Sequence, residues 1–127
     1  GFLSYLVKLS INKKKYSLIG YKGKQVRDNL HSYDLINCFW EFYKKPRKGE
    51  VYNIGGGRYS NCSIIEALNL LEKVANINIK KEKINLPRVG DHIWYISNLT
   101  KFKKHYPNWK QKYNTKRIIE ELIENQK

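Results

Sequence analysis

The sequence predicts an α/β fold, and one strand–loop–helix unit carries most of that prediction. A β-prone run at residues 50–54 leads into three consecutive glycines at 55–57. After them, Ser63-Ile64-Ile65-Glu66 forms a capping box, in which the serine and glutamate side chains satisfy backbone N–H groups at a helix start. Other short β-prone runs and amphipathic helices follow one another along the chain. A strand, a glycine loop and a helix in this order are typical of an α/β protein.

The first thirty residues predict one helix and two extended runs. Apolar residues recur at a helical spacing within 1–9, and the polar segment 11–15 predicts a turn. Residues 16–19 are rich in β-prone side chains and are expected to form a strand that Gly20 closes. Residues 25–30 are expected to be short and extended.

A strongly amphipathic helix is predicted to begin at Ser32, its expected N-cap, and to run to about residue 45, where Pro46 stops it. We interpret His31 and Asp34 as supports that position the preceding strand and start this helix. One face of the helix is apolar and is expected to face a core: Leu35, Ile36, Phe39, Trp40 and Tyr43.

The helix after the capping box also has an apolar face, formed by Ile64, Ile65, Ala67, Leu68, Leu71 and Val74. Residues 77–86 alternate apolar and polar side chains in two phases, which predicts an edge-like strand with a loop. Residues 87–91 predict a turn with two charges, and 92–96 are expected to be extended.

Two further helices are predicted near the end of the sequence. Ser97 or Asn98 is expected to cap a short helix through Lys104, which Pro107 ends. Asn114 is expected to cap the final helix. Its core-facing residues are predicted to be Ile118, Ile119, Leu122 and Ile123.

The 127 residues amount to one domain or part of one, and an apolar content of 41% is enough for a packed core. No apolar run is long enough for a transmembrane helix, and no signal peptide is expected because polar residues soon follow Phe2 and Leu3. The sequence contains no Met, so we expect a fragment of a longer protein. Cys38 and Cys62 are expected to be small buried residues in helical segments, which fits a reducing, cytoplasmic location.

A formal charge of +14 suggests nucleic-acid binding, and an aromatic content of 13% would allow stacking on bases. Genome bias is the other explanation, because residues with A/T-rich codons are in excess and the lysines are dispersed. The predicted core position of Phe39, Trp40 and Tyr43 also argues against base stacking. A small basic nucleic-acid-binding module therefore remains the alternative from a different class.

Arg27 and Arg88 are the candidate ligand-binding residues on pattern alone. They are two of 5 arginines in a chain with 20 lysines, and each lies beside a glycine-containing loop and an acid, Asp28 or Asp91. The planar arginine fork holds several donors in a geometry that suits bidentate phosphate binding. A surface salt bridge with the neighbouring acid is the other interpretation.

Three other patterns predict no chemistry. The glycine run at 55–57 lacks the later glycines of a dinucleotide fingerprint, so a tight turn is expected. Tyr106 and Lys110 have a Y-x-x-x-K spacing, but Pro107 opposes the helix that such a catalytic pair needs. The two cysteines and three histidines lack metal-ligand spacing, so no metal is expected.

Four motifs, in order, resemble the C-terminal half of the extended short-chain dehydrogenase/reductases, the NAD-dependent nucleotide-sugar epimerase/dehydratase family. The stretch 23–34 resembles the R-D-x-x-H-x-x-D signature, and 51–57 resembles the Y-N-[ILV]-G-x-G strand. Residues 88–91 resemble the R-x-G-D turn. Segments 97–101 and 106–109 resemble the closing helix and its tail.

The amino-acid sequence at 20–29 and 90–94 looks closest to the CDP-paratose 2-epimerase branch of that family. The resemblance implies an α/β C-terminal substrate-binding portion of a Rossmann-type fold, including the last strand and helices of the Rossmann-like domain. Residues 1–127 would form this single C-terminal unit, with the N-terminal NAD-binding half absent. As a free fragment it is expected to expose apolar surface around Leu35, Phe39 and Trp40.

The resemblance also implies a ligand and its contacts. Arg27 and Arg88 would grip the diphosphate of a nucleotide-sugar, and Asp91 would accept hydrogen bonds from the ribose hydroxyls. Three further residues are expected at the nucleotide end of the pocket or near the base: Asn53, Tyr21 and Lys24.

The implied reaction is an epimerisation in which a sugar carbon is transiently oxidised to a ketone and then reduced again. NAD and the catalytic residues would be held mainly by the absent half, so this chain alone is not expected to catalyse. The full-length enzyme is expected to be a cytoplasmic homo-oligomer with a nucleotide-sugar substrate, no membrane partner and no nucleic-acid partner. Another dehydratase or reductase of the same family is the alternative.

Overall fold

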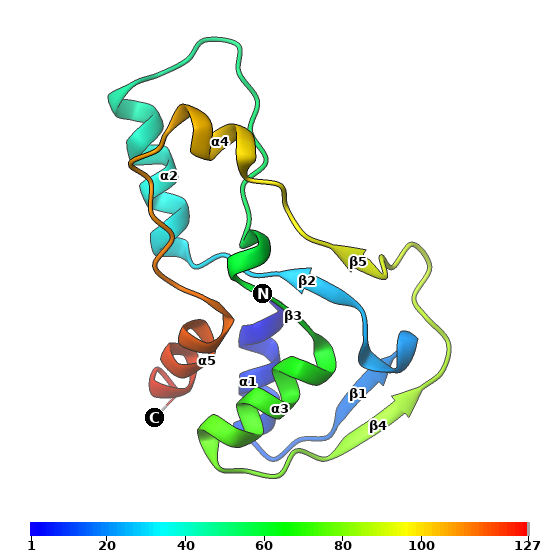
Figure 1. The fold of residues 1–127 in the computed structure, drawn as a ribbon. Helices are drawn as coiled ribbons and strands as arrows, with labels where there is room; N and C mark the ends of the chain where they lie inside the picture. Colours follow the sequence, from blue (N-terminus) through cyan, green and yellow to red (C-terminus); the bar gives the residue numbers. More distant parts are fainter. Residues whose placement is uncertain (127) are drawn as a thin grey trace.

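The computed structural model describes residues 1–126, which form a mixed α/β arrangement (Figure 1). Two single turns of 3-10 helix, η1 (Tyr21–Gly23) and η2 (Gly57–Tyr59), precede β2 and β3. The helices and strands in chain order are α1 (Phe2–Ile11), β1 (Tyr16–Ile19), β2 (Val26–Asp28), α2 (Ser32–Lys44), β3 (Asn61–Ser63), α3 (Ile64–Ala75), β4 (Lys81–Ile84), β5 (Trp94–Tyr95), α4 (Thr100–His105) and α5 (Thr115–Glu124).

The strands form two small sheets. Strands β1 and β4 pair in parallel, with Tyr16 opposite Lys81. Strand β2 is the centre of the other sheet, between antiparallel β3 and parallel β5. In this sheet Arg27 lies opposite Cys62 on one side and Tyr95 on the other, so both flanking strands fix the position of its backbone.

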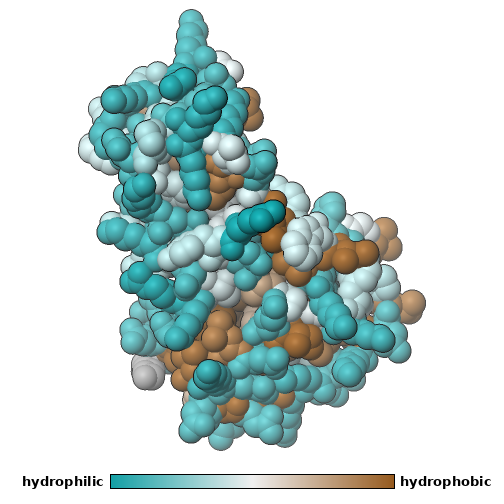
Figure 2. All heavy atoms as spheres, in the orientation of Figure 1, coloured by the Kyte–Doolittle hydropathy of each residue, from teal (hydrophilic) through white to brown (hydrophobic). Residues whose placement is uncertain are grey.

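The main core lies where helices α1, α3 and α5 pack against one another and against β1 (Figure 1). The residues buried there include Leu6, Leu18, Leu68, Leu71 and Ile119. The capping box predicted at the start of α3 is present, because Ser63 Oγ accepts from Glu66 N and Glu66 Oε2 accepts from Ser63 N. Figure 2 shows hydrophobic side chains gathered over this lower part, with hydrophilic ones over much of the upper part.

A second, smaller core joins α2 to α4 and the segment after it. Its buried members are Cys38, Leu99, Phe102, Tyr106 and Trp109. The carboxylate of fully buried Asp34 accepts hydrogen bonds from the backbone N–H groups of residues 112 and 113, each at 2.9 Å. Asp34 therefore ties the start of α2 to the segment before α5.

The apolar face of α2 is exposed to solvent. Ile36, Phe39, Trp40 and Tyr43 are each more than half exposed, whereas the residues that α2 buries are Asp34 and Cys38. The exposure expected of a fragment is therefore confirmed for Phe39 and Trp40. The predicted core position of Phe39, Trp40 and Tyr43 is therefore wrong for this chain, and it does not argue against base stacking. Periodicity identifies an apolar face but not what covers it.

Residues 50–54 do not form the predicted strand. They are irregular, and within 1–126 they pair with no strand. Their polar contacts go to α4, where Lys101 Nζ donates to Val51 O at 2.9 Å and Tyr52 Oη lies 2.7 Å from His105 Nδ1. A strand needs a neighbour to satisfy its ladder, and here the neighbour is a helix.

Three local predictions also need correction. The N-cap of α2 is His31, whose Nδ1 accepts from Tyr33 N, and Ser32 is the first helical residue. Cys62 is buried as expected but lies in β3 and not in a helix. The N-cap of α4 is Leu99, although Asn98 Oδ1 does accept from Thr100 N. Among residues 1–126, no helix has the length and apolar content that crossing a bilayer requires.

Candidate functional site

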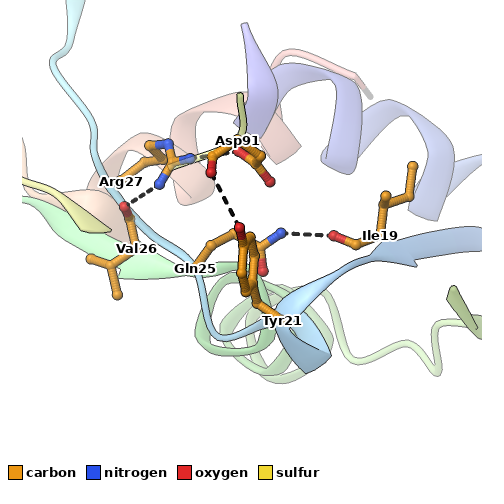
Figure 3. A network of polar contacts seen from close by, with 6 residues as sticks. All are labelled: Ile19, Tyr21, Gln25, Val26, Arg27 and Asp91. Atoms are coloured by element: carbon orange, nitrogen blue, oxygen red, sulfur yellow. Dashed lines mark hydrogen bonds and ion pairs between the residues drawn. The ribbon is translucent and has the colours of Figure 1, made fainter. Parts of the chain in front are cut away.

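Arg27 is held by two contacts at the centre of the β2 sheet. Its Nη2 lies 2.7 Å from Asp91 Oδ1, and its Nη1 donates to Val26 O at 2.7 Å (Figure 3). The side chains of Arg27 and Asp91 keep only 30% and 21% of their surface exposed. The guanidinium is therefore fixed in orientation but still open to a ligand on its remaining side.

The turn that carries Arg88 and Asp91 is fastened to η1. Asp91 N donates to Arg88 O at 3.1 Å, which closes the turn, and Gly90 has a φ of +76°. Tyr21 Oη donates to Asp91 O at 3.3 Å (Figure 3). This bond links two segments that are 70 residues apart in sequence.

Gly20 sets how closely β1 and the Arg88 turn approach each other. Its N–H donates to Ile84 O at 2.8 Å, and its φ is +69°. A Cβ on Gly20 would lie 2.6 Å from Pro87 Cα, which is closer than real Cβ contacts come. The absence of a side chain at Gly20 therefore permits the chain path that brings Arg88 next to β1.

Arg27, Arg88 and Asp91 line one cavity of about 230 Å³. The complete lining is Phe2, Tyr16, Ser17, Ile19, Gln25, Arg27, Cys62, Ile64, Arg88 and Asp91. The two arginines predicted from separate motifs thus converge on one site, and Arg88 belongs to none of the ion pairs found within residues 1–126. An anion would meet two cations there, one of them without a carboxylate partner in that part of the chain.

The two aromatic side chains that line this cavity, Phe2 and Tyr16, add no negative charge to it. Tyr16 is 8% exposed, and burial raises the pKa of its phenol while the charge of Arg88 opposes that rise. The hydroxyl therefore stays protonated at neutral pH, so Tyr16 adds no negative charge beside the arginines. Asp91 is the carboxylate of the lining.

Two of the residues predicted to bind substrate lie outside this cavity. Lys24 and Asn53 are exposed and are not among its lining residues. Tyr21 does not line it either but contacts it through Asp91. Conversely, the sequence reasoning missed Gln25, which is 5% exposed and does line the cavity. The strand period of two, which places Gln25 and Arg27 on one face, was the signal that could have found it.

Asp28 does not pair with Arg27, in contrast to the surface salt-bridge interpretation. Its Oδ2 accepts from Gly57 N and from Ser97 N, each at 2.9 Å. A Cβ on Gly55 would lie 2.5 Å from this oxygen, and a Cβ on Gly56 would lie 2.2 Å from Ser60 O. The glycine run is therefore a tight turn packed against backbone and side chains, which leaves no room for a dinucleotide pyrophosphate.

Three further titratable side chains, His31, Cys38 and Tyr106, make structural contacts. His31 stacks on Tyr113 with ring centroids 3.9 Å apart, and its Nε2 lies 3.1 Å from Glu121 Oε1. Burial, with a smaller contribution from Asp34, raises the pKa of the Cys38 thiol to about 12, so it is no nucleophile at neutral pH. Tyr106 follows the end of α4 and donates from its hydroxyl to Lys45 O, so it does not share a helical face with Lys110.

Metal ligands are not gathered in the part of the chain that the structure describes. Within residues 1–126 no three His, Cys, Asp or Glu side chains gather in a way that could hold a metal ion. The geometry instead offers a half-buried cationic cavity with one carboxylate, which suits a diphosphate with a polar group attached.

Comparison with known proteins gives relatives over nearly the whole chain. It is 31% identical over 121 residues to CDP-paratose 2-epimerase of Salmonella typhi, covering 93% of this chain and 34% of that protein. It is 33% identical over 102 residues to UDP-arabinose 4-epimerase 1 of Arabidopsis thaliana, covering 77% of this chain and 23% of that protein. No family model matches the sequence.

A solved structure gives the same picture of the fold. The dTDP-glucose 4,6-dehydratase of Bacillus anthracis, crystallised with NAD, matches with a TM-score of 0.81 and 26% identity, over 98% of this chain and 38% of that one. The matched region is the C-terminal portion of that Rossmann-type fold. The chain spans about a third of the length of the Salmonella typhi relative, at 34%.

Proposed function

We propose that this chain, a member of the extended short-chain dehydrogenase/reductase family that corresponds to its C-terminal portion, forms the nucleotide-sugar-binding part of an NAD-dependent sugar-nucleotide epimerase or dehydratase. The observation that carries this proposal is the convergence of Arg27, Arg88 and Asp91 on one cavity. These residues come from two motifs that are 64 residues apart in sequence, counted from Arg27 to Asp91.

The cavity suits a nucleoside diphosphate in both charge and hydrogen bonding. Two guanidinium groups supply forked donors for two phosphates. Asp91 uses Oδ1 to hold Arg27, and its Oδ2 makes no hydrogen bond within residues 1–126, so it is free to accept from a ribose hydroxyl. This chain would thus bind and orient the substrate, while hydride transfer to and from a sugar carbon would be supplied by bound NAD.

The NAD site itself fits poorly on the described residues. The glycine run at 55–57 is filled by Asp28, Ser97 and Ser60, so it offers no cradle for a second pyrophosphate. The cofactor and the catalytic residues would therefore belong to a part of the longer protein that these 127 residues do not cover. On this proposal the present chain is inactive alone.

The exposed face of α2 and the unpaired segment 50–54 fit the same proposal. Phe39, Trp40 and Tyr43 of α2 are exposed, and so is Val51 in the segment that follows α2 in the sequence. An uncovered apolar helix face and a β-prone segment without a neighbouring strand are both expected where the part of a fold that covers them is not included. We expect the cofactor-binding part of the enzyme to cover this face and to pair with residues 50–54.

A finer assignment is a CDP-paratose 2-epimerase-like reaction, with transient oxidation to a keto-sugar and reduction on the other face. It is supported by 31% identity to the Salmonella typhi enzyme over 93% of this chain. Another epimerisation or dehydration within the family is compatible with the same proposed diphosphate cavity, because on this proposal the cavity would contact the nucleotide and not the reacting carbon.

Because the chain has a net charge of +14, nucleic acid is the alternative ligand to a nucleotide-sugar. Arg58 and most of the lysines are exposed, and so are the aromatic rings of α2. Against it, Trp40 and Tyr43 stack on each other with centroids 5.6 Å apart, and the exposed face of α2 contains no lysine between residues 33 and 43. A base would have to displace that ring pair without help from neighbouring cations.

Isothermal titration of the chain with inorganic pyrophosphate and with CDP tests the proposal. Arg88→Ala should lower both affinities about tenfold or more, because it removes a charge-assisted contact. Arg47→Ala is the matched control, since it removes the same charge from an exposed loop outside the cavity. Equal affinities in the two variants, or tight single-stranded DNA binding at physiological salt with no pyrophosphate binding, would refute the proposal.

A further inference from the structure

Gln25 carries a buried oxygen that nothing in residues 1–126 satisfies. The side chain is 5% exposed, and its Nε2 donates to Ile19 O at 2.9 Å (Figure 3). Its Oε1 is shielded from water and has no hydrogen-bond partner. A buried amide oxygen without a partner has lost its hydrogen bonds to water and gained none in return, so its presence in a residue that lines a cavity calls for a partner.

The orientation of the amide follows from its neighbour. Ile19 O accepts a hydrogen bond, so it must face the NH₂ group, and turning the amide over would place two oxygens against each other. Gln25 can therefore present only an acceptor to the cavity. With Nε2 held by Ile19 O, Oε1 is the atom of this amide that still lacks a partner.

The position of Gln25 in the cavity identifies the end of the ligand that it would contact. Gln25 and Arg27 lie two residues apart on one extended segment, so their side chains leave the same face roughly 7 Å apart. The same cavity is also lined by apolar and aromatic side chains, Tyr16, Ile19 and Ile64. Phosphates would contact the two arginines, and a planar ring would suit the aromatic and aliphatic side chains of the same lining.

We propose that Gln25 Oε1 accepts a hydrogen bond from an N–H group on the edge of the nucleobase, and so acts as a base-recognition residue. This inference rests on the proposed nucleotide site and adds the end of the ligand that the arginines do not reach. An exocyclic amine or a ring imide N–H satisfies the oxygen, whereas a base edge with only acceptors there would repel it.

The second buried amide oxygen without a partner provides the comparison. Gln111 Oε1 is also unpaired, and its Nε2 donates to Gly56 O at 3.0 Å. Gln111 lies outside the cavity that holds Arg27 and Arg88. A substitution there removes the same group without touching the nucleotide site.

Titrations of Gln25→Met and Gln111→Met with four probes test this inference. The probes are CDP, UDP, ribose 5-diphosphate and pyrophosphate. Gln25→Met should weaken binding of the nucleoside diphosphates about five- to tenfold, the range expected for one hydrogen bond, and leave the two base-free probes unchanged. Gln111→Met should change none of the four affinities.

The outcomes separate the two proposals. Unchanged nucleotide affinity in Gln25→Met, or an equal loss for ribose 5-diphosphate, overturns the base contact while intact pyrophosphate binding upholds the arginine site. The arginine site itself is refuted by a different result, namely equal pyrophosphate affinity in wild type and Arg88→Ala. If Gln25→Met does not fold, wild-type protein decides the matter, because 3-methyl-UDP lacks the imide N–H and should bind more weakly than UDP.

Discussion

The guanidinium of Arg27 lies 2.7 Å from the carboxylate of Asp91, although 64 residues separate them in sequence. Strand β2 supplies the arginine, and the turn before β5 supplies the acid. Because β2 and β5 are neighbours in one sheet, their pairing places the two motifs together. The order of the strands in this sheet therefore brings Arg27 and Asp91 to the same cavity.

Asp91→Asn should separate the two roles proposed for this residue. The amide keeps the shape but removes a charge that competes with phosphate for Arg27, so pyrophosphate should bind as well as before or more tightly. A nucleoside diphosphate should bind severalfold more weakly, because a ribose hydroxyl loses its carboxylate acceptor. Isothermal titration with pyrophosphate and CDP measures both. Parallel losses for the two ligands would contradict this division of roles.

Gly20→Ala should disturb both stability and the Arg88 turn. A methyl group there meets Pro87 Cα at 2.6 Å with a φ of +69°, so we expect about 2 kcal/mol of destabilisation. Gly49→Ala is the control, since its φ is +75° but nothing lies within 4 Å of its Cβ, which leaves about 1 kcal/mol of backbone strain. Urea unfolding measures the difference. Only Gly20→Ala should also weaken pyrophosphate binding, and a loss in both variants would point to general destabilisation.

Asp34→Asn should loosen the attachment of α2. Its buried carboxylate accepts from Lys112 N and Tyr113 N, and an amide can satisfy only one of these donors, so we expect a loss of about 2 kcal/mol. Tyr33→Phe provides the control, because it removes an exposed contact between the same segments, Lys112 Nζ to Tyr33 Oη at 2.8 Å. That loss should stay below about 1 kcal/mol. Urea unfolding curves of equal midpoint for the two variants would refute the assignment.

Glu72→Gln should change how stability responds to acid. Hydrogen bonding from Ile79 N, aided by Lys81, lowers the pKa of the Glu72 carboxyl below its ordinary value of 4.5. A carboxyl whose pKa is lowered in the folded state contributes its full stabilisation at pH values above its ordinary pKa. That contribution is lost as the pH falls through the folded-state pKa. Wild type should therefore exceed Glu72→Gln in unfolding free energy at pH 6 and converge with it as the pH falls below 4.5.

The control for that experiment is Glu124→Gln, at an exposed position near the end of α5. Its difference from wild type should stay near zero across the same pH range. A constant gap between wild type and Glu72→Gln at pH 6 and pH 3 would show that the residue contributes by packing and not by its charge.

Local sequence signals predicted the helix starts that depend on nearby residues. The capping box at Ser63 and the Asn114 cap are both present, because each involves residues only three apart. The α2 cap was shifted by one residue, since His31 can use Nδ1 in the same way as a serine hydroxyl and its neighbour offered the more usual side chain.

Features that depend on distant partners were harder to predict. Residues 50–54 have the composition of a strand, yet pairing decides whether a strand forms, and within 1–126 they have no partner. The sequence did single out Arg27 and Arg88, but only the crossing of β1, β2 and the turn before β5 shows that they line one cavity. Gln25 escaped notice because a glutamine in a polar stretch looks solvated until its burial is known.

Adjacent residues of strand β2 serve its two faces, because successive side chains on a strand point to opposite sides. Arg27 points to the cavity, while Asp28 holds the amides of Gly57 and Ser97 on the other side. The three-residue strand β2 therefore connects the cavity to the part of the fold built on α2 and α4. Hydrogen–deuterium exchange at those two amides would read out occupancy of a cavity that they never touch.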